Sequence, residues 1–162
     1  MKGTVLIGQS GGPTAVINAS AAGVIDRVRA VSPDTPILGM NFAVEGCMED
    51  KIIDLSSLNS AEVGRLKETP GSALGSCRYK LKDEDLGLIV EKLKKLDIRY
   101  IFLAGGNDTM DTIQRISAYA AQTGYELLGV GIPKTVDNDL YGTDHTPGYG
   151  SAGRYTALSV LQ

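Results

Sequence analysis

The feature of this sequence that most constrains its fold is a regular alternation of short apolar runs, glycine-rich loops and stretches with helical periodicity. Four apolar runs rich in β-branched residues predict buried strands, at 4–7, 36–40, 99–104 and 126–132. Apolar residues recur at helical spacing in three longer stretches, at 15–30, 83–96 and 110–122. Nearly continuous apolar strands that alternate with helices are typical of a parallel sheet covered on both faces. The pattern therefore predicts an α/β fold, a Rossmann-like three-layer αβα sandwich with a mostly parallel sheet.

The remaining segments carry weaker patterns. Ser60 is expected to cap a short helix that Pro70 and Gly71 stop. The stretch before this helix is expected to be irregular apart from an edge strand at 51–55. A long polar loop follows the last strand, and a further helix is expected from Ser151 onward.

Composition excludes several classes of protein. With 16 Lys and Arg against 19 Asp and Glu, the net charge of −3 gives no electrostatic reason to bind nucleic acid or an acidic membrane. No apolar run approaches the roughly 18 residues of a membrane span, and the first run is too short for the core of a signal peptide. Cys47 and Cys77 lie far apart and form no zinc or disulfide pattern, so we expect inert thiols and a cytoplasmic protein.

In open α/β sheets ligands bind beyond the carboxyl ends of the strands, and three of these ends carry unusual loops. The first loop, GQSGGPT, places Gly11 and Gly12 just before a helix N-terminus. Free backbone N–H groups and the positive end of the helix dipole make such a place an anion site. A tight strand-to-helix turn would also require glycine, so this loop alone leaves both interpretations open.

The second loop, GGNDT, crowds an amide, a carboxylate and a hydroxyl against a helix start. Asn107 and Asp108 offer the hard oxygen ligands that suit Mg²⁺ held together with substrate phosphates. The alternative is that Asp108 or Thr109 serves as the N-cap of the helix. Capping needs only one of these side chains, so it does not account for the whole cluster.

The third loop, PKTVDND, is the most informative. Lys134, Thr135 and two carboxylates follow directly from a buried strand. If the backbone is extended there, Asp137 and Asp139 point the same way, so that one can meet a metal while the other takes a proton. A carboxylate base beside a hydroxyl, a lysine and bound phosphate suits phosphoryl transfer. The alternative is a surface turn with a solvated lysine.

Basic residues elsewhere offer further candidates. Arg78 and Lys80 could clamp a phosphate or belong to a basic surface loop, and Arg154 has the same two interpretations. His145, the only histidine, is interpreted as a hydrogen-bonding loop residue.

Five phrases in this order resemble the phosphofructokinase family over essentially the whole chain: GQSGGPTAVINA, PGSALGSCRYK, GGNDTMDT, GIPKTVDNDL and TDHTPGYGSA. Within the family, the chain is most similar to the diphosphate-dependent branch. The resemblance implies that Gly11 and Gly12 bind the donor diphosphate and that Arg78 bridges its phosphates. It also implies Mg²⁺ as the cofactor, with Asn107 and Asp139 at the metal, although many members have Asp at the position of Asn107.

The resemblance further implies how the acceptor is held. Asp137 matches the residue that accepts the proton of the sugar hydroxyl, and Thr135, Val136 and Asp137 match positions that contact fructose 6-phosphate. The expected reaction transfers a phosphoryl group from diphosphate to the C1 hydroxyl of that sugar.

Two side chains carry the expectation that the donor is diphosphate. Where members that use ATP usually have glycine, this chain has Asp108 and Lys134. A carboxylate at 108 would repel the α-phosphate of a nucleotide, and the ammonium of Lys134 would offset charge on the departing phosphate. An ATP-dependent phosphofructokinase and a non-catalytic phosphate-binding α/β domain remain the alternatives.

Family members are considerably longer, so the chain is expected to be an N-terminal portion that is inactive alone. Residues 1–140 are expected to form the α/β domain that binds the donor phosphate, and residues 141–162 to lead into a second lobe. The full-length protein is expected to be a homodimer with diphosphate and fructose 6-phosphate as its partners.

Overall fold

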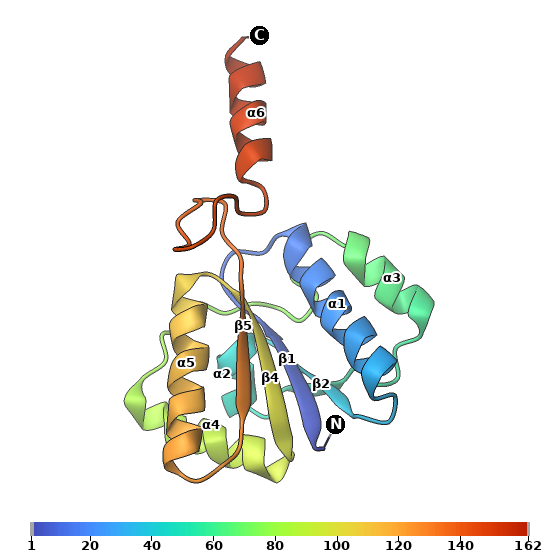
Figure 1. Ribbon diagram of the computed structural model, residues 1–162, viewed down its shortest axis with the longest axis vertical. Helices are drawn as coiled ribbons and strands as arrows, with labels where there is room; N and C mark the ends of the chain where they lie inside the picture. The colour runs from blue at the N-terminus through green and yellow to red at the C-terminus, as the bar shows by residue number, and fades with distance from the viewer. Residues whose placement is uncertain (1, 162) are drawn as a thin grey trace.

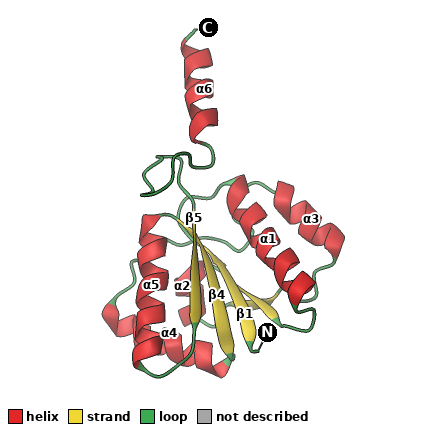
Figure 2. Ribbon diagram, in the orientation of Figure 1, coloured by secondary structure: helices red, strands yellow, loops and turns green. Residues whose placement is uncertain are grey.

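A computed structural model describes residues 2–161, and its centre is a five-stranded sheet in the order β3-β2-β1-β4-β5. Figure 2 shows this sheet between its helices. Four strands run parallel, namely β1 (Thr4–Gln9), β2 (Ile37–Met40), β4 (Ile98–Gly105) and β5 (Leu128–Pro133). The edge strand β3 (Ile52–Asp54) pairs antiparallel with β2. The four predicted strands and the predicted edge strand are therefore confirmed, but the prediction that all four are buried is wrong for β5, whose residues are half-buried or exposed.

Helices cover both faces of this sheet. One face carries α1 (Ala15–Val31) and α3 (Ser60–Glu68), and the other carries α2 (Ala43–Met48), α4 (Asp83–Lys95) and α5 (Asn107–Gln122) (Figure 1). Successive side chains of a strand point to opposite faces. Leu6 accordingly joins the core under α4 and α5, while Val5 and Ile7 join the core under α1. The three-layer αβα sandwich is confirmed.

The starts of α5 and α3 differ from the prediction. Helix α5 begins at Asn107 rather than at 110, and its N-cap is Gly106, which has no side chain to cap with. The alternative interpretation, in which Asp108 or Thr109 caps this helix, is therefore wrong: both lie within the first turn, and Thr109 is buried against Gly105. The prediction that Ser60 caps α3 is also wrong, because Ser60 is the first helical residue and the side chain of Asn59 before it accepts from the amide of Glu62.

Helix α2 was not expected at all. A Cβ atom at Gly46 would lie 1.5 Å from the carbonyl oxygen of Asn41, so this short helix requires glycine to pack against the preceding chain. Phe42 and Ala43 enter the helix with φ of +64° and +52°. Six residues are too few for a helical period to be recognised in the sequence.

The last helix, α6 (Tyr149–Val160), stands apart from the other layers (Figure 1). It begins two residues before the predicted position, and all of its residues are exposed. Among residues 2–161, no helix has the length and apolar character that crossing a bilayer requires.

Candidate active site

The carboxyl ends of β1, β4 and β5 border a cleft of about 620 Å³. Seven of the candidate binding and catalytic residues line it: Gly11, Gly12, Arg78, Lys80, Asn107, Asp108 and Asp137, whereas Lys134 and Asp139 do not. They come from four segments of the chain. The cleft therefore brings together three loops that follow strands and the segment between α3 and α4.

The first loop meets the second at their glycines. The amide of Ser10 donates to the carbonyl of Ala104 over 2.8 Å, and a Cβ atom on Gly11 would lie 3.6 Å from the amide nitrogen of Gly106. Gly11 has a φ of +76°, which favours glycine. The N-cap residue of α1, Thr14, makes no side-chain hydrogen bond to the helix, and the first turn contains no acidic residue. Two helices without side-chain caps therefore begin at the loops that line this cleft, which favours an anion, and the carboxylate of Asp108 in the first turn of α5 acts against it.

Arg78 reaches the cleft from the segment between α3 and α4. This segment is joined to the first loop, because the amide of Gly11 donates to the carbonyl of Cys77 over 3.4 Å and the hydroxyl of Ser10 donates to the same oxygen over 3.3 Å. Within the described chain, residues 2–161, the guanidinium of Arg78 makes no hydrogen bond or ion pair. It is exposed and available to a ligand.

Lys134 links the end of β5 to the first loop. Its backbone amide donates to the carbonyl of Gly105 over 2.8 Å, and its ammonium donates to the carbonyl of Gly12 over 2.6 Å. The side chain is half-buried. An ammonium carries three N–H donors, so the bond to Gly12 leaves two for a ligand.

Asp137 and Asp139 do not lie as an extended strand would place them. Asn138 between them has a φ of +56°, which breaks the alternation of side chains that the sequence suggested. Asp137 lines the cleft, whereas Asp139 accepts a hydrogen bond from the side-chain amide of Asn107 over 2.8 Å. The expectation of two carboxylates pointing the same way from an extended chain is therefore wrong. The two predicted metal residues, Asn107 and Asp139, do meet.

Thr135 and Val136 do not line the cleft. The hydroxyl of Thr135 accepts a hydrogen bond from the amide of Asp137 over 3.0 Å, and so supports the turn that carries the carboxylate. Val136 is exposed and lies near Gly148, just before α6.

The far part of the cleft is formed by side chains that the sequence did not single out. Asp111, Thr112 and Arg115 line it, and Arg115 forms an ion pair with Asp83 over 2.6 Å. Together with Asp108, these residues follow the spacing of one helix face, which is the pattern that could have revealed them.

Cys77 and Tyr79 also line the cleft, and Cys47 lies in the neighbouring core. Burial raises the pKa of the Cys47 thiol to about 11, so its thiolate is scarce at neutral pH. A hydrogen bond that the phenol of Tyr79 donates to Asp85 over 2.9 Å raises the pKa of that phenol.

Among residues 2–161, no group of three or more His, Cys, Asp or Glu could hold a metal ion by itself. Mg²⁺ usually binds through one or two carboxylates together with substrate phosphates and water. The carboxylates of Asp137 and Asp139 near the anion-favouring loops fit that second kind of site.

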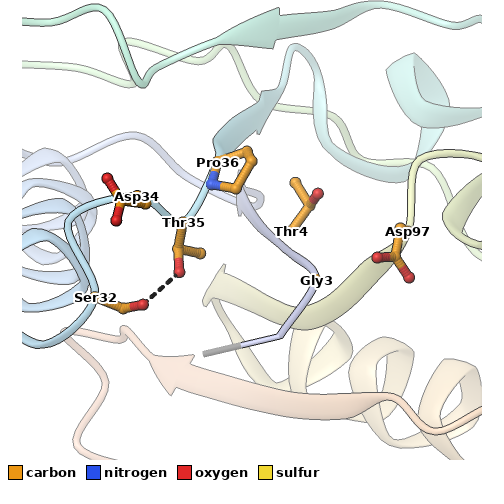
Figure 3. A pocket seen from close by; sticks show the side chains of 7 residues that line it. All are labelled: Gly3, Thr4, Ser32, Asp34, Thr35, Pro36 and Asp97. Atoms are coloured by element: carbon orange, nitrogen blue, oxygen red, sulfur yellow. Dashed lines mark hydrogen bonds between the residues drawn. The ribbon is translucent and has the colours of Figure 1, made fainter.

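A second hollow of about 440 Å³ lies at the opposite edge of the sheet, where the strands begin (Figure 3). It contains none of the residues that the sequence singled out. Its lining is Gly3, Thr4, Ser32, Asp34, Thr35, Pro36 and Asp97.

Comparisons with known proteins agree with the resemblance. A pyrophosphate–fructose 6-phosphate 1-phosphotransferase of Xanthomonas campestris pv. campestris is 45% identical over 99% of this chain. A sulfofructose kinase of Alkalicoccus urumqiensis is 38% identical over 96% of this chain. The crystal structure of a pyrophosphate-dependent phosphofructokinase from Marinobacter aquaeolei is 40% identical, covers 98% of this chain and superposes with a TM-score of 0.88.

The chain spans only part of these relatives. It covers 39% of the Xanthomonas protein, 40% of the Alkalicoccus protein and 40% of the Marinobacter chain. The model of one family, phosphofructokinase, matches residues 4–161, which is nearly every residue described. The chain therefore belongs to the phosphofructokinase family.

Proposed function

We propose that this chain forms the donor-binding part of a diphosphate-dependent 6-phosphofructokinase. The observation that carries the proposal is the convergence of Gly12, Arg78 and Asp137 on one cleft, with the ammonium of Lys134 bonded to Gly12. Names of relatives support the same donor and acceptor.

The proposed reaction moves one phosphoryl group. Asp137 accepts the proton of the C1 hydroxyl of fructose 6-phosphate, and the oxygen attacks a phosphorus atom of diphosphate. The bond between that phosphorus and the bridging oxygen breaks, so fructose 1,6-bisphosphate and phosphate are formed. Arg78 and the amide of Gly12 hold the donor while charge moves onto the departing phosphate, because the amides of Ser10 and Gly11 already donate to backbone carbonyls.

Diphosphate rather than ATP is proposed as the donor because of the charges around the cleft. Asp108 lies in the first turn of α5 and lines the cleft, where its carboxylate repels the additional phosphate of a nucleotide. Lys134 supplies a cation on the other side of the first loop.

Mg²⁺ is proposed to bind on the phosphates of the donor, with Asn107 and Asp139 as the residues nearest to it. When bound, such an ion neutralises phosphate charge during transfer. The hydrogen bond between Asn107 and Asp139 fixes the direction of one carboxylate oxygen before the donor arrives.

Fewer residues of the cleft support the proposed site for the sugar than support the site for the donor. Thr135 and Val136 remain proposed contacts of fructose 6-phosphate, although both lie outside the cleft. The relative named sulfofructose kinase favours testing a second acceptor, the sulfonated fructose of that name.

The proposal includes the organisation of the longer protein. Residues 1–140 form the domain that binds the donor phosphate, and residues 141–162 begin the connection to a second lobe. The complete enzyme is proposed to be a cytoplasmic homodimer that binds neither nucleic acid nor membrane.

Calorimetric titration tests the donor site directly. With Mg²⁺ present, the 162-residue chain is expected to bind diphosphate more tightly than ADP or NAD. Tighter binding of ADP would favour the ATP-dependent alternative, and no binding of diphosphate would contradict the proposal.

A chimaera tests the reaction. Residues 4–161 would replace the matching segment of the Xanthomonas relative, and formation of fructose 1,6-bisphosphate from diphosphate would be measured, with sulfofructose as the competing acceptor. We expect turnover with fructose 6-phosphate in the chimaera and little in the isolated chain. Diphosphate binding without turnover in a folded chimaera would instead favour a non-catalytic phosphate-binding domain.

A further inference from the structure

Two amide side chains are fully buried where β1 passes into α1. Gln9 is the last residue of β1 and Asn18 lies in the first turns of α1, and both are 0% exposed. The amide nitrogen of Gln9 donates to the carbonyl of Ile17 over 3.1 Å and to the side-chain oxygen of Asn18 over 2.9 Å. Buried amide side chains need hydrogen-bond partners for their polar atoms, so Gln9 and Asn18 require the neighbouring chain to supply donors and acceptors at fixed positions.

The remaining bonds of the pair all go to the segment that follows α3. The side-chain oxygen of Gln9 accepts from the hydroxyl of Ser72 over 2.8 Å and from the amide of Leu74 over 2.9 Å. Asn18 donates to the carbonyl of Thr69 over 2.8 Å and accepts from the amide of Ala73 over 2.9 Å. The side chains of Gln9 and Asn18 thus bond to backbone groups of a segment that has no helical or sheet hydrogen bonds of its own.

That segment leads directly to Arg78. It has no regular secondary structure between α3 and α4, so its course depends on contacts such as these. Beyond Leu74 it continues beside the first loop, where the hydroxyl of Ser76 donates to the carbonyl of Gly11.

The same segment is held from its other side. The amide of Phe42 donates to the carbonyl of Leu74 over 2.8 Å, and a Cβ atom on Gly75 would lie 2.6 Å from the ring of Phe42. Phe42 adopts a left-handed backbone conformation that costs free energy in a residue with a side chain. Strain beside the cleft indicates that the course of this segment is set by the surrounding structure.

We propose that Gln9 and Asn18 are positioning residues that fix the segment from Thr69 to Arg78, so that the guanidinium of Arg78 stays at the end of the cleft lined by the glycine loops. Neither amide lines the cleft. Both act through the backbone they hold. The identity of the ligand, diphosphate, rests on the proposed function, whereas the fixing of the segment does not.

The test combines hydrogen exchange with diphosphate titration on the 162-residue chain. Gln9→Met keeps the length of the side chain but loses its hydrogen bonds, and it is expected to speed amide exchange in residues 72–78 about tenfold relative to β1 and β4. The dissociation constant for diphosphate with Mg²⁺ is expected to rise about tenfold.

Milder variants keep the test informative if Gln9→Met does not fold. Ser72→Ala removes the hydroxyl that lies 2.8 Å from the side-chain oxygen of Gln9 and 2.6 Å from the carbonyl oxygen of Gly75, and it is expected to weaken diphosphate binding about threefold, while Ser72→Thr, which keeps the hydroxyl, restores it. Thr35→Val is the matched control, because Thr35 is buried and hydrogen-bonded at the opposite edge of the sheet. It should change neither measurement.

Coupling to Arg78 separates positioning from general stability. If Gln9 acts through Arg78, then Gln9→Met should weaken binding no further in a chain that already carries Arg78→Ala. Three results would overturn the proposal. The losses of diphosphate affinity from Gln9→Met and Arg78→Ala could multiply in the double variant, amide exchange could rise equally in every strand, or amide exchange at residues 72–78 could stay unchanged. If the unaltered chain does not bind diphosphate, the proposed function fails, and exchange at 72–78 still decides whether the amides fix the segment.

Discussion

The two edges of the sheet carry hollows that differ in their charged side chains and in the helix ends beside them. At the carboxyl edge, the cleft lies beside the loops that lead into α1 and α5, and its lining includes three basic and three acidic side chains: Arg78, Lys80, Arg115, Asp108, Asp111 and Asp137. At the amino edge, the hollow lies beyond the C-termini of α1 and α4 and contains Asp34 and Asp97 (Figure 3). Helix dipoles favour an anion at the first edge and disfavour one at the second.

The contrast teaches that the direction of the strands decides where a phosphate can bind. In a parallel sheet every helix that follows a strand begins at the carboxyl edge, so the positive helix ends gather there whatever the loops contain. The loops then add specificity to a place that the fold has already made favourable. Gly11 and Gly12 let a ligand approach the backbone, and the side chain of Lys134 adds a charge.

The largest expected effect comes from the base at the carboxyl edge. Asp137→Asn in the chimaera is expected to lower turnover about a thousandfold, because the amide cannot accept the hydroxyl proton. Steady-state kinetics and titration together measure this. Diphosphate affinity should change less than about threefold, since Asp137 is proposed to contact the sugar hydroxyl rather than the donor. A variant with nearly normal turnover would show that the base lies elsewhere.

The donor residues give the next effect. Replacing both Asp108 and Lys134 by glycine in the chimaera is expected to lower kcat/KM with diphosphate about a hundredfold, because the cation beside the departing phosphate is lost. Use of ATP should rise at the same time, since the repelling carboxylate is gone.

Lys134→Met with Asp108 retained is the control for that donor experiment. It should lose activity with diphosphate and gain none with ATP. If the double variant behaves as the unaltered chimaera does with both donors, the assignment of the donor is wrong.

Arg78 gives a smaller effect, on affinity. Arg78→Ala is expected to weaken diphosphate binding by the 162-residue chain about tenfold to thirtyfold, the range for losing a charged hydrogen bond. Calorimetric titration measures it. Lys82→Ala is the matched control, because Lys82 belongs to the same segment, lies outside the cleft and pairs with Glu84. Equal losses in both variants would mean that only the general charge of the segment matters.

The sequence predicted the sheet and its two covered faces because each strand is a local apolar run. The strands of the carboxyl edge end at glycine loops whose meeting point follows from parallel order alone. Helix α2 escaped prediction because its formation depends on distant partners. The amide of Phe42 bonds to Leu74, and Gly46 packs against Asn41. Such contacts leave no pattern in the six residues of the helix, so the sequence could not predict it.

The candidate site, like the fold, was predictable where its features are local in sequence. Each loop could be found from its glycines and charged residues, whereas the hydrogen bonds that join one loop to another could not. The ammonium of Lys134 bonds to Gly12, which is 122 residues away, and Gln9 bonds to Leu74, which is 65 residues away. The left-handed backbone of Asn138, which separates Asp137 from Asp139, depends on its side chain accepting from the amide of Thr146 and donating to the carbonyl of Asp144.

The smallest expected effect tests the comparison itself. Asp34→Asn with Asp97→Asn removes two negative charges at the amino edge, and simple attraction by net charge would then strengthen diphosphate binding. The six residues of β1 separate the two edges by roughly 20 Å, more than twice the Debye length of about 8 Å at physiological ionic strength. Affinity measured by titration should therefore change less than about twofold under those conditions.

At about 0.01 M salt, where the Debye length reaches roughly 30 Å, the affinity of this variant for diphosphate should rise modestly. A larger gain at physiological ionic strength would mean that long-range charge, rather than the helix ends and loops of the carboxyl edge, governs binding.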